Sequence, residues 1–583
     1  MGVRAVSLAS GALVVGSVAV VDPGGLAPFG PAKWLVVSTL GLVAAGSALW
    51  AASRRLDRPT SVLWTVLLAA LGLAALLGGD VPTALLGEPT RHLGFVTWAL
   101  FALLFCAGQQ LDRRDTRVLA RAVVVATGAL GAWSLWERVV GRPISLDVDT
   151  DRLTGPFGSA AIMGAACCLL VPVCVAVAMD RAERRSWRGG AATSAAVGVW
   201  VLVESGSRAA GLGAVAAAAG VVVRGRPSRR ALGGGAAVLA VALCVAAPRI
   251  GELTERASGA ASRLDEWRVA TRVIGAHPLL GVGPEGYRIA FSDGVDREYE
   301  REHSRDTVLP DRAHSAPLDV ALAGGVPAAL AYVALVALIC VRAGRMIGAQ
   351  RATPAVAGIA AGLIAYATQQ LLLFPLAELD PIWWLFAGYI VAAGHDTAPA
   401  GAGTVRRWPA AVALACAPVS LGAGVLGVAA DRLAERSLTE RDLTSAVASA
   451  ERAVSLRPDD VRYRMVAAEV LARRGTLVDI DEAIRHADRA LAWSPDDPIA
   501  ADRHATVLLD RAAITGEPRD IDRAIDAWQV LVDRDPVRAR WQVQLGRAAA
   551  LAGDAARARS AWRSAADLGS EAGAQLLAEL ETR

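Results

Sequence analysis

The sequence predicts an all-α protein in two parts, a polytopic membrane helix bundle followed by a soluble helical repeat domain. Hydrophobic residues make up 54% of the 583 residues, which is typical of a membrane protein rather than a soluble enzyme. Apolar runs long enough to cross a bilayer recur through the first 430 residues. From Asp431 onward the sequence changes to a charged, alanine-rich helical pattern. We therefore predict one domain at 1–430 and a second at 431–583.

The apolar runs mark the expected membrane helices. We expect about thirteen of them, at residues 4–21, 32–52, 60–78, 92–111, 117–137, 158–179, 190–204, 208–223, 230–249, 317–341, 355–374, 381–396 and 408–430. The first run has the length of a signal peptide, but no small-residue cleavage site follows it. We therefore interpret it as an uncleaved anchor.

The placement of arginine predicts the orientation of this bundle. Arginines gather in alternate loops, at positions 54–55, 113–114, 181–188, 224–230, 342–351 and 406–407. Because cytoplasmic loops carry the excess of positive charge, all six loops are expected in the cytoplasm. The N-terminus then also lies in the cytoplasm, whereas an outer loop at about 250–316 and the C-terminal domain lie outside it. We expect a multi-pass protein of the cell membrane, in contact with membrane lipids.

Charge and cysteine content exclude several classes of function. The net charge of +4 comes without a basic stripe interleaved with aromatic residues, so we expect no nucleic-acid partner. The seven cysteines all lie in apolar runs and lack metal-ligand spacing, which predicts neither a disulfide framework nor a metal site. Asp147 and Asp149 form a D-x-D string on the outer side, with Asp151 close by. A solvated loop is the preferred interpretation there, with a weak cation site as the alternative, and we expect no cofactor.

The long polar interval at 262–317 begins with a helical pattern. Apolar residues recur at three- and four-residue steps, which places them on one face of a helix. They are Leu264, Trp267, Ala270, Val273 and Ile274. Ser262 and Asp265 match a capping box, so the helix is expected to start at Arg263. Pro278 is expected to end it at the preceding residue.

The three arginines of this helix fall on different faces. Arg268 and Arg272 lie opposite the apolar arc, where we expect solvated side chains or contacts with lipid headgroups. Arg263 lies within the arc, and a buried guanidinium requires an anion or a carboxylate as its partner. The alternative is a first-turn arginine that extends its head group to water. We favour a functional role for Arg263.

Ionisable residues also stand at the outer ends of other predicted helices. Glu204 and Arg208 flank a turn with almost no loop, so both are expected near the outer headgroup level. Ionisable residues at that depth are functional candidates, although a local pair between these two is the alternative. His314 and Ser315 directly precede the helix that opens with Pro317. A histidine at such a position serves as a cap or as a base, and the spacing does not decide between them.

Two glycine-containing stretches are predicted to be turns. Residues 152–158, RLTGPFG, form a glycine-proline turn that leads into the sixth run. Residues 281–286, GVGPEG, match the pattern G-x-G-x-x-G. No strand precedes this stretch and it lies outside the cytoplasm, so a tight outer turn is preferred to a dinucleotide site.

The C-terminal domain contains an internal repeat. AERAVSLRPDD at 450–460, ADRALAWSPDD at 487–497 and AWQVLVDRDPV at 527–537 align, and residues 555–569 form a divergent last unit. Alanine-rich second helices that close on a proline every 37 to 41 residues are typical of tetratricopeptide-like helix–turn–helix units. Such arrays form concave binding surfaces, so we expect a protein partner for this domain.

Several of these features together resemble the O-antigen ligase/polymerase family. The resemblance rests on the Ser-Arg turn that ends at Arg208, the R-x-x-x-W pattern that starts at Arg263, the following HPLLGVGPEGY, and His314 at the next helix entrance. It covers about residues 150–345 by motif and the first 430 by topology. RLTGPFGSAAIMG, from Arg152 onward, is similar to the family's segment before the sixth helix, with Ser-Ala-Ala in place of the usual Asn-Pro-Asn.

The ligase signature of the family is met only in part. It consists of His, a polar residue, nine positions, Gly, two positions and then Gly, Thr or Tyr. His314, Ser315 and Gly325 fit it, whereas Ala328 departs from it. A polymerase therefore stays open beside a ligase.

The resemblance implies a metal-independent membrane glycosyltransferase at the outer face of the cytoplasmic membrane. Such an enzyme transfers or polymerises a polyprenyl-diphosphate-linked glycan onto a glycan, lipid or protein acceptor. The resemblance implies that Arg208 and Arg263 bind the diphosphate, a role that bidentate guanidinium contacts suit. It implies that His314 acts as general base on the acceptor hydroxyl or positions it, with a near-neutral pKa. Further candidate substrate-binding residues are Arg152, Arg272 and Asp319, of which Asp319 either orients His314 or caps its helix.

Two functions from other classes compete with this one. A lipid-linked glycan flippase or transporter requires ionisable residues along the membrane interior, whereas the apolar runs consist mainly of Ala, Val, Leu and Gly. A non-enzymatic membrane-anchored repeat scaffold leaves Arg208 and the amphipathic outer helix without a role.

Overall fold

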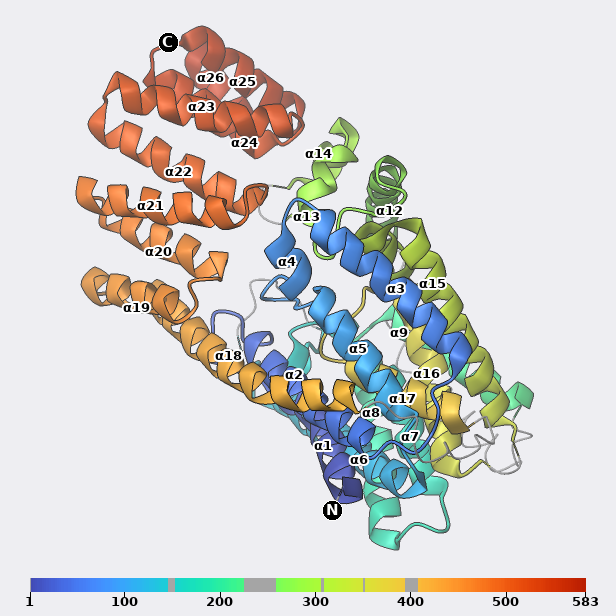
Figure 1. Ribbon diagram of the computed structural model, residues 1–583. Coiled ribbons are helices and arrows are strands. Elements are labelled where there is room, and N and C mark those ends of the chain that lie inside the picture. The colour runs from blue at the N-terminus through green and yellow to red at the C-terminus, as the bar shows by residue number, and fades with distance from the viewer. Residues whose placement is uncertain are drawn as a thin grey trace.

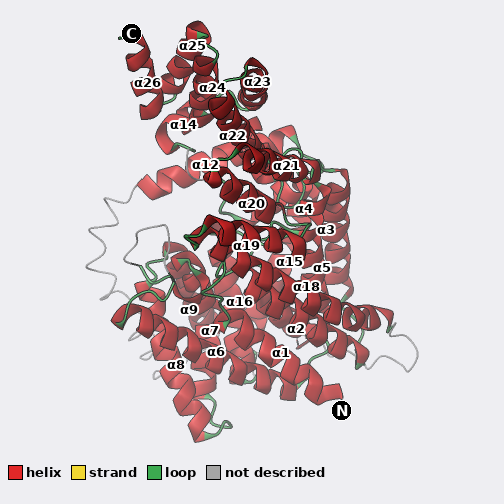
Figure 2. Ribbon diagram, turned by 90° about the vertical axis from the view of Figure 1, so that its left-hand side faces the viewer, coloured by secondary structure: helices red, strands yellow, loops and turns green. Residues whose placement is uncertain are grey.

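The computed structural model describes residues 2–144, 152–224, 258–305, 309–349, 352–393 and 407–582. Every secondary-structure element within these ranges is a helix, which confirms the all-α fold class. Figure 1 shows a bundle of long helices with the C-terminal helices stacked at one end of it. Figure 2 shows the same helices joined by loops from a second direction.

The bundle consists of helices that run between its two ends. They are α1 (Gly2–Ala19), α2 (Pro31–Trp50), α3 (Arg58–Leu77), α5 (Phe95–Gly108), α6 (Arg113–Val139), α7 (Ala160–Met179), α8 (Arg185–Glu204), α9 (Arg208–Arg224), α15 (Ala316–Ile347), α16 (Pro354–Gln369), α17 (Asp380–Ala393) and α18 (Trp408–Thr439). They coincide with the predicted runs except 230–249, which lies outside the described residues. Among the described helices, seven are long and apolar enough to cross a membrane. The total of thirteen stays a prediction.

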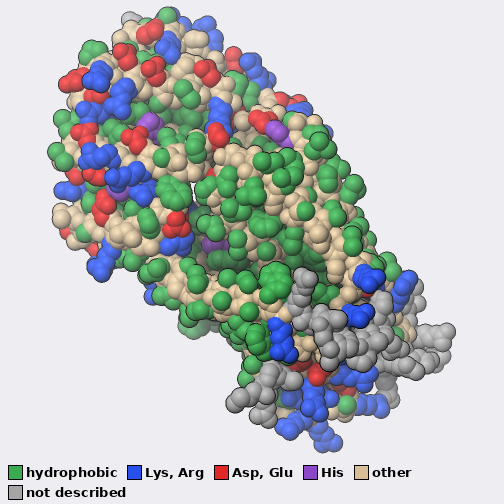
Figure 3. Space-filling model, viewed as in Figure 1, with side chains coloured by type: hydrophobic (Ala, Val, Ile, Leu, Met, Phe, Trp, Pro, Cys, Tyr) green, Lys and Arg blue, Asp and Glu red, His purple; other side chains and the backbone are tan. Residues whose placement is uncertain are grey.

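The inside and the outside of the bundle are both apolar. Helices α7 and α17 are largely enclosed by their neighbours, and Leu169 and Phe386 are fully buried. Helices α3 and α18 instead expose large apolar side chains such as Leu76 and Val419. Figure 3 shows these hydrophobic side chains covering the bundle, while charged side chains gather at its ends and over the C-terminal helices. An apolar outer surface of this kind suits contact with lipid.

Lys and Arg side chains gather at the end of the bundle opposite the C-terminal helices (Figure 3). Arg54 donates a hydrogen bond from Nη1 to the carbonyl oxygen of Leu111 at 3.1 Å, and Arg342 pairs with Asp57 at 3.1 Å. These contacts join three loops that the sequence places on one side of the membrane. These contacts support the prediction that the three loops lie on one side of the membrane. The assignment of that side to the cytoplasm stays a prediction.

The opposite end carries short helices that form an outer cap. They are α4 (Val81–Leu86), η1 (Gly155–Phe157), α12 (Ser258–Ala276), α13 (Tyr287–Ala290), η3 (Phe291–Asp293), α14 (Arg297–His303) and η4 (Gln370–Leu372). A small core holds the cap together, in which Val269, Ala270 and Val273 of α12 pack with Phe291 of η3 and Ala313.

The outer helix α12 differs from its prediction at its start. It begins at Ser258 rather than Arg263, and the side chain of Asp265 pairs with Arg268 and His303 instead of closing a capping box. Leu264, predicted in the buried arc, is 53% exposed because the small core begins only at Val269. The predicted end is nearly right, since α12 ends at Ala276.

A break in α15 receives the loop that follows α12. Gly324 and Gly325 have non-helical dihedral angles, and Gly325 has φ 74°. The loop satisfies the backbone groups freed by the break, because Val282 N donates to Leu322 O at 2.7 Å and Val326 N donates to Pro278 O at 2.8 Å. A Cβ at Gly325 would lie 2.3 Å from a loop carbonyl oxygen, so only glycine fits. The predicted tight turn at 281–286 is confirmed.

The C-terminal helices form antiparallel pairs. They are α19 (Leu443–Leu456), α20 (Val461–Arg474), α21 (Leu477–Trp493), α22 (Pro498–Thr515), α23 (Pro518–Arg534), α24 (Ala539–Leu551), α25 (Ala555–Asp567) and α26 (Glu571–Glu581). Helices α19, α21 and α23 each end two residues before the repeat prolines at 458, 495 and 536, which confirms that these helices close on them. The first pair is completed by the end of α18, so the predicted boundary at 430/431 falls inside one continuous helix. The tetratricopeptide-like character stays a prediction.

The turns between successive helix pairs rest on the outer cap. Arg305 is 2% exposed and pairs with Glu300 at 2.5 Å and with Asp535 of the α23–α24 turn at 2.6 Å. Glu300 also accepts a hydrogen bond at 3.1 Å from the backbone N–H of Ala539, which is the first residue of α24. Arg288 pairs with Asp497 of the preceding turn at 2.7 Å. The C-terminal domain is therefore fixed against the cap by buried ion pairs.

Candidate active site

The backbone around His314 is held from two sides just before α15. Asp319, buried one turn into α15, accepts hydrogen bonds from Ala313 N at 3.0 Å and from Ser315 N at 3.3 Å. The indole Nε1 of Trp267 in α12 donates to Ala313 O at 2.8 Å. These bonds hold His314 at φ 51°, a left-handed conformation that a residue with a side chain adopts only when its surroundings enforce it.

The imidazole of His314 lies beside a phenylalanine that also contacts two arginines. The ring centroids of His314 and Phe374 are 5.4 Å apart. The guanidinium groups of Arg91 and Arg312 lie 4.9 Å and 5.8 Å from the same Phe374 ring. Within the described part of the chain, Nδ1 of His314 is buried and has no hydrogen-bond partner. The ring is thus placed by packing, and this nitrogen is left without a protein partner.

Carboxylates fix both of these arginines. Nε of Arg91 lies 2.8 Å from Oδ2 of Asp311, and Arg312 pairs with Glu285. The other oxygen of Glu285 accepts a hydrogen bond from Leu93 N at 2.8 Å. The half-buried Arg91–Asp311 pair and the buried Arg312–Glu285 pair thus connect the loop before α5 to the loop before α15.

Arg263 approaches the same place from α12. It is half-buried, and its Nη1 donates to the carbonyl oxygen of Leu372 in η4 at 2.6 Å. Its partner in the described structure is therefore a main-chain oxygen, not the anion or carboxylate expected for a buried arginine. A backbone carbonyl satisfies one donor of a guanidinium. Burial raises the pKa of Glu266, and Arg263 opposes that shift at longer range, but no carboxylate of the described residues forms an ion pair with Arg263.

Arg208 is the first residue of α9, as the Ser-Arg turn predicts, and it is exposed. Helix α9 packs along α16, and Gly213 lies against the carbonyl oxygen of Ala365. This register brings the first turn of α9 beside the last turn of α16 and η4. The helix that carries Arg208 and the side chain of Arg263 therefore both contact η4.

The electrostatic setting keeps His314 neutral. Burial and, after it, the charge of Arg263 lower the pKa of His314 to about 4, whereas Asp311 opposes them. The expected near-neutral pKa is thus wrong for the ligand-free chain, because the sequence does not reveal how dry the site is. Burial alone would raise the pKa of Asp311, but Arg91 and Arg312 outweigh it and hold that pKa below its usual range. At neutral pH the site combines a neutral imidazole with several fixed cations.

Backbone strain gathers at this site. Among the described residues, the non-glycine residues with positive φ are His92, Glu285 and His314, at 55°, 64° and 51°. Leu93, next to His92, donates to Glu285, which pairs with Arg312 two residues before His314. Strained residues persist where the surrounding structure enforces them, and they cluster at functional sites.

Three further predicted residues have different surroundings. Nε of Arg152 donates to the carbonyl oxygen of Ser205 at 2.7 Å, which ties the turn before α7 to the turn before α9. Arg272 contacts Gly294 O at 3.0 Å and Asp296 at 2.6 Å, on the far side of α12 from Arg263. Asp319 bonds to the backbone on either side of His314 rather than to its ring.

One cluster of potential metal ligands lies near the site. The ligand atoms of Asp265, Glu302 and His303 lie within 4.8 Å of one another, and His303 is 3.2 Å from Asp265. A second such cluster, Glu451, Glu482 and His486, lies in the C-terminal domain. The D-x-D string at 147–149 lies outside the described residues. The absence of a metal requirement stays a prediction.

Sequence reasoning missed four residues of this site. They are Arg91, Glu285, Arg312 and Phe374. Arg312 stands in the string DRAH, two residues before His314, which the sequence did single out, so its closeness in the chain was a usable signal. Arg91 and Phe374 lie in connections between membrane helices far away along the chain, and no spacing links them to His314.

The class of protein follows from this arrangement and from one comparison. Residues 192–333, about a quarter of the chain, match the family model of the O-antigen ligase. The matched segment includes Arg208, Arg263, His314 and Asp319, and it ends inside α15. The match supports a membrane enzyme of the O-antigen ligase/polymerase type. A search of curated proteins found no match to the chain.

Proposed function

We propose that this protein is a metal-independent membrane glycosyltransferase. It transfers or polymerises a glycan carried on a polyprenyl diphosphate onto an acceptor hydroxyl at the outer face of the cytoplasmic membrane. The observation that carries the proposal is the proximity of Arg263, which forms no ion pair with a carboxylate among the described residues, to a neutral and strained His314 at the start of α15.

The chemistry divides between these two residues. The acceptor oxygen attacks the anomeric carbon of the donor sugar, the bond between that carbon and the phosphate oxygen breaks, and the lipid diphosphate leaves. His314 accepts the proton of the acceptor hydroxyl, which general-base catalysis requires. Arg263 and Arg208 bind the diphosphate and stabilise the negative charge that grows on the leaving oxygen. The first turn of α15 adds a positive helix end at the same place.

Donor binding strengthens the base in this mechanism. The cationic field of Arg263 is one cause of the low pKa of His314, after burial. A diphosphate bound to Arg263 offsets that field, so the pKa of His314 rises when the donor is present. The imidazole then becomes a better proton acceptor only in the complex that uses it.

Transfer from a purified lipid-diphosphate donor tests the proposal. We expect Arg263→Ala to abolish transfer, while Arg268→Ala, five residues along the same helix and paired with Asp265, retains it. Wild-type transfer should persist in a chelator. Equal loss in both variants, or loss in chelator with recovery on adding a divalent ion, would contradict the mechanism.

The proposed location of the site requires a cytoplasmic N-terminus and an extracytoplasmic C-terminal domain. The outer cap and the C-terminal domain lie at the same end of the bundle, opposite the arginine-rich loops (Figure 1). A reporter fused to the C-terminus tests this orientation. A cytoplasmic reporter signal would place the cap on the wrong side for an outer-face acceptor.

A further inference from the structure

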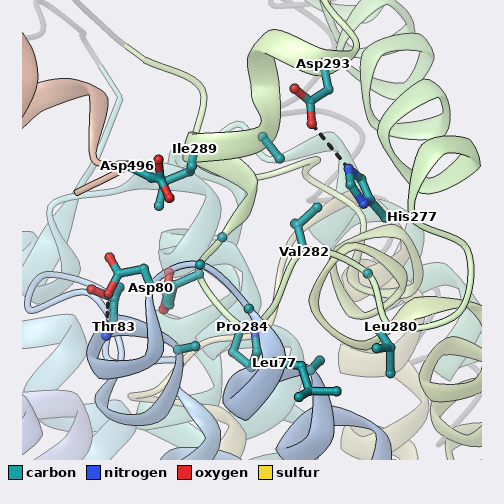
Figure 4. Close-up of a pocket in the computed structure, with 18 of the residues that line it drawn as sticks. Leu77, Asp80, Thr83, His277, Leu280, Val282, Pro284, Ile289, Asp293 and Asp496 are labelled. Carbon is teal, nitrogen blue, oxygen red and sulfur yellow. Dashed lines mark hydrogen bonds and ion pairs between the residues drawn. The ribbon is translucent and has the colours of Figure 1, made fainter. Parts of the chain in front are cut away.

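A cavity of about 620 Å³ lies between the outer cap, the end of α3 and the C-terminal domain. Its walls come from three distant parts of the chain. Leu77 and Asp80 belong to the α3–α4 region, His277 and Asp293 to the cap, and Asp496 to the α21–α22 turn. Figure 4 shows these side chains around one space, with Leu77 and Leu280 at one end of it and the acidic groups away from them. Its volume falls within the usual range of roughly 300–1,000 Å³ for ligand sites.

The cavity is acidic, whereas the surroundings of His314 are basic. Asp80, Asp293 and Asp496 line the cavity together with the guanidinium of Arg534, and Glu285 also lines it but has its charge balanced by Arg312. Arg534 itself lies 3.5 Å from Asp496, and His277 lies 3.3 Å from Asp293. A lipid diphosphate is repelled by such a wall and attracted to the arginine side. Carboxylates accept hydrogen bonds from hydroxyl and ammonium groups, which sugars supply in number.

One ion pair separates the two environments. Glu285 lines the cavity and pairs with Arg312, which stands two residues before His314. The loop that follows α12 lines the cavity. The same loop fills the break in α15, the helix that begins just after His314. The cavity therefore shares its rigid elements with the reaction centre, so a ligand held in it keeps a fixed position relative to His314.

We propose that this cavity binds the sugar end of the acceptor, and that it takes neutral or amino sugars and rejects uronic acids. The inference rests on the proposed glycosyl transfer, because it assigns the acceptor side of that reaction. It also gives the C-terminal domain a direct role, since Asp496 and Arg534 complete the wall. The donor then enters on the arginine side and the acceptor on the acidic side.

Binding of trisaccharides to the purified full-length protein tests the inference without any transfer step. The probes are chitotriose, its deacetylated counterpart and an oligosaccharide of uronic acids, followed by saturation-transfer NMR. We expect binding of the first two and none of the third. Absence of binding by all three, or equal binding of the uronic-acid probe, would overturn the assignment.

Two kinds of variant locate the binding. Ile289→Trp fills the cavity from α13, and its control Val530→Trp adds the same side chain at an exposed position of α23. Asp293→Asn and Asp496→Asn remove charge at constant size, with the exposed Asp533→Asn as their control. We expect Ile289→Trp to weaken trisaccharide binding by occupying the space. We expect each Asp→Asn variant to weaken binding, and to raise the acceptor KM, by about tenfold, the loss of one charge-assisted hydrogen bond. The controls should match the wild type.

The outcomes separate this inference from the proposed function. If Arg263→Ala abolishes transfer but the cavity variants bind trisaccharides like the wild type, the cavity assignment fails and the glycosyl transfer stands. If transfer survives Arg263→Ala, the proposed function fails, and with it the acceptor role of the cavity, whatever the sugar binding.

Discussion

The surroundings of His314 and the junction with the C-terminal domain are both rich in buried arginine, but they use it differently. At the junction, Arg305 is enclosed by Glu300 and Asp535, and Arg288 is paired with Asp497. At the site, Arg263 bonds to a main-chain oxygen, and the buried Nδ1 of His314 has no partner among the described residues.

The difference separates positive charge that holds the fold from positive charge held ready for a ligand. A buried arginine with two carboxylates has its charge balanced by the protein itself. A guanidinium that bonds to a carbonyl and forms no ion pair keeps donors and charge available, and an incoming anion can bind them. The junction should therefore respond to mutation through stability, and the site through activity.

After Arg263→Ala, the largest loss of glycan transfer is expected for His314→Ala. Removal of a general base typically lowers the rate by about 10²–10⁴-fold. The arginines remain, so donor binding should be largely retained. The measurement is kcat for glycan transfer together with donor affinity. Full activity in His314→Ala would mean that the strain and burial of this histidine serve only the fold.

Arg305→Ala should produce the largest loss of stability. It leaves Glu300 and Asp535 buried without their partner, and breaking such a pair costs about 3–5 kcal/mol. Limited proteolysis should release the C-terminal helices faster than in the wild type. Arg301→Ala serves as the control, because Arg301 is exposed and donates to the carbonyl oxygen of Asp567 at 2.6 Å. Unchanged proteolysis of Arg305→Ala would show that other contacts hold the domain.

The comparison also explains which parts of the site the sequence could predict. Arg208, Arg263 and His314 lie at helix ends or on a helix face, so local periodicity and proline placement single them out. Phe374, Arg91 and Glu285 reach the site through loops that come from three separate parts of the chain. Their approach depends on how the membrane helices pack, which periodicity does not specify. The exposed Leu264 has a related cause, because a helical arc is buried only where another element covers it.

The helix pairs of the C-terminal domain were predictable because the repeat prolines mark their ends. Their attachment to the outer cap was not. In the sequence, Asp497 and Asp535 have the pattern of ordinary turn residues. Only the structure shows that they pair with Arg288 and Arg305. An ion pair between residues more than 200 positions apart leaves no local pattern.

The pH dependence sharpens the role of Arg263. The pKa of His314 is lowered to about 4 by burial and then by Arg263, so the imidazole is neutral at pH 7 and gains a proton only near pH 4. The value of kcat/KM for transfer should therefore decrease as the pH is lowered toward this pKa. As the pH is lowered, kcat should begin to decrease at a higher pH than kcat/KM does. The reason is that the bound diphosphate offsets the charge of Arg263 and so raises the pKa of His314. In Arg263→Gln, NMR titration of the imidazole should give a pKa raised by about one unit, since one fixed charge is lost. An unchanged pKa would show that burial and the other charges set it without Arg263.

The smallest effect is expected for Arg272→Ala, on the same helix as Arg263. Arg272 is 51% exposed, and it pairs with Asp296 and contacts Gly294 O. Exposed ion pairs contribute about 0.2–1 kcal/mol, because water screens both charges. Arg272 also lies nine residues from Arg263, or about 13 Å along a helix. We therefore expect transfer within about twofold of the wild type and a small loss of thermal stability, measured on the same preparation. If Arg272→Ala instead lost transfer as fully as Arg263→Ala, the donor would contact both sides of α12. The division between its binding arginine and its structural arginine would then be wrong.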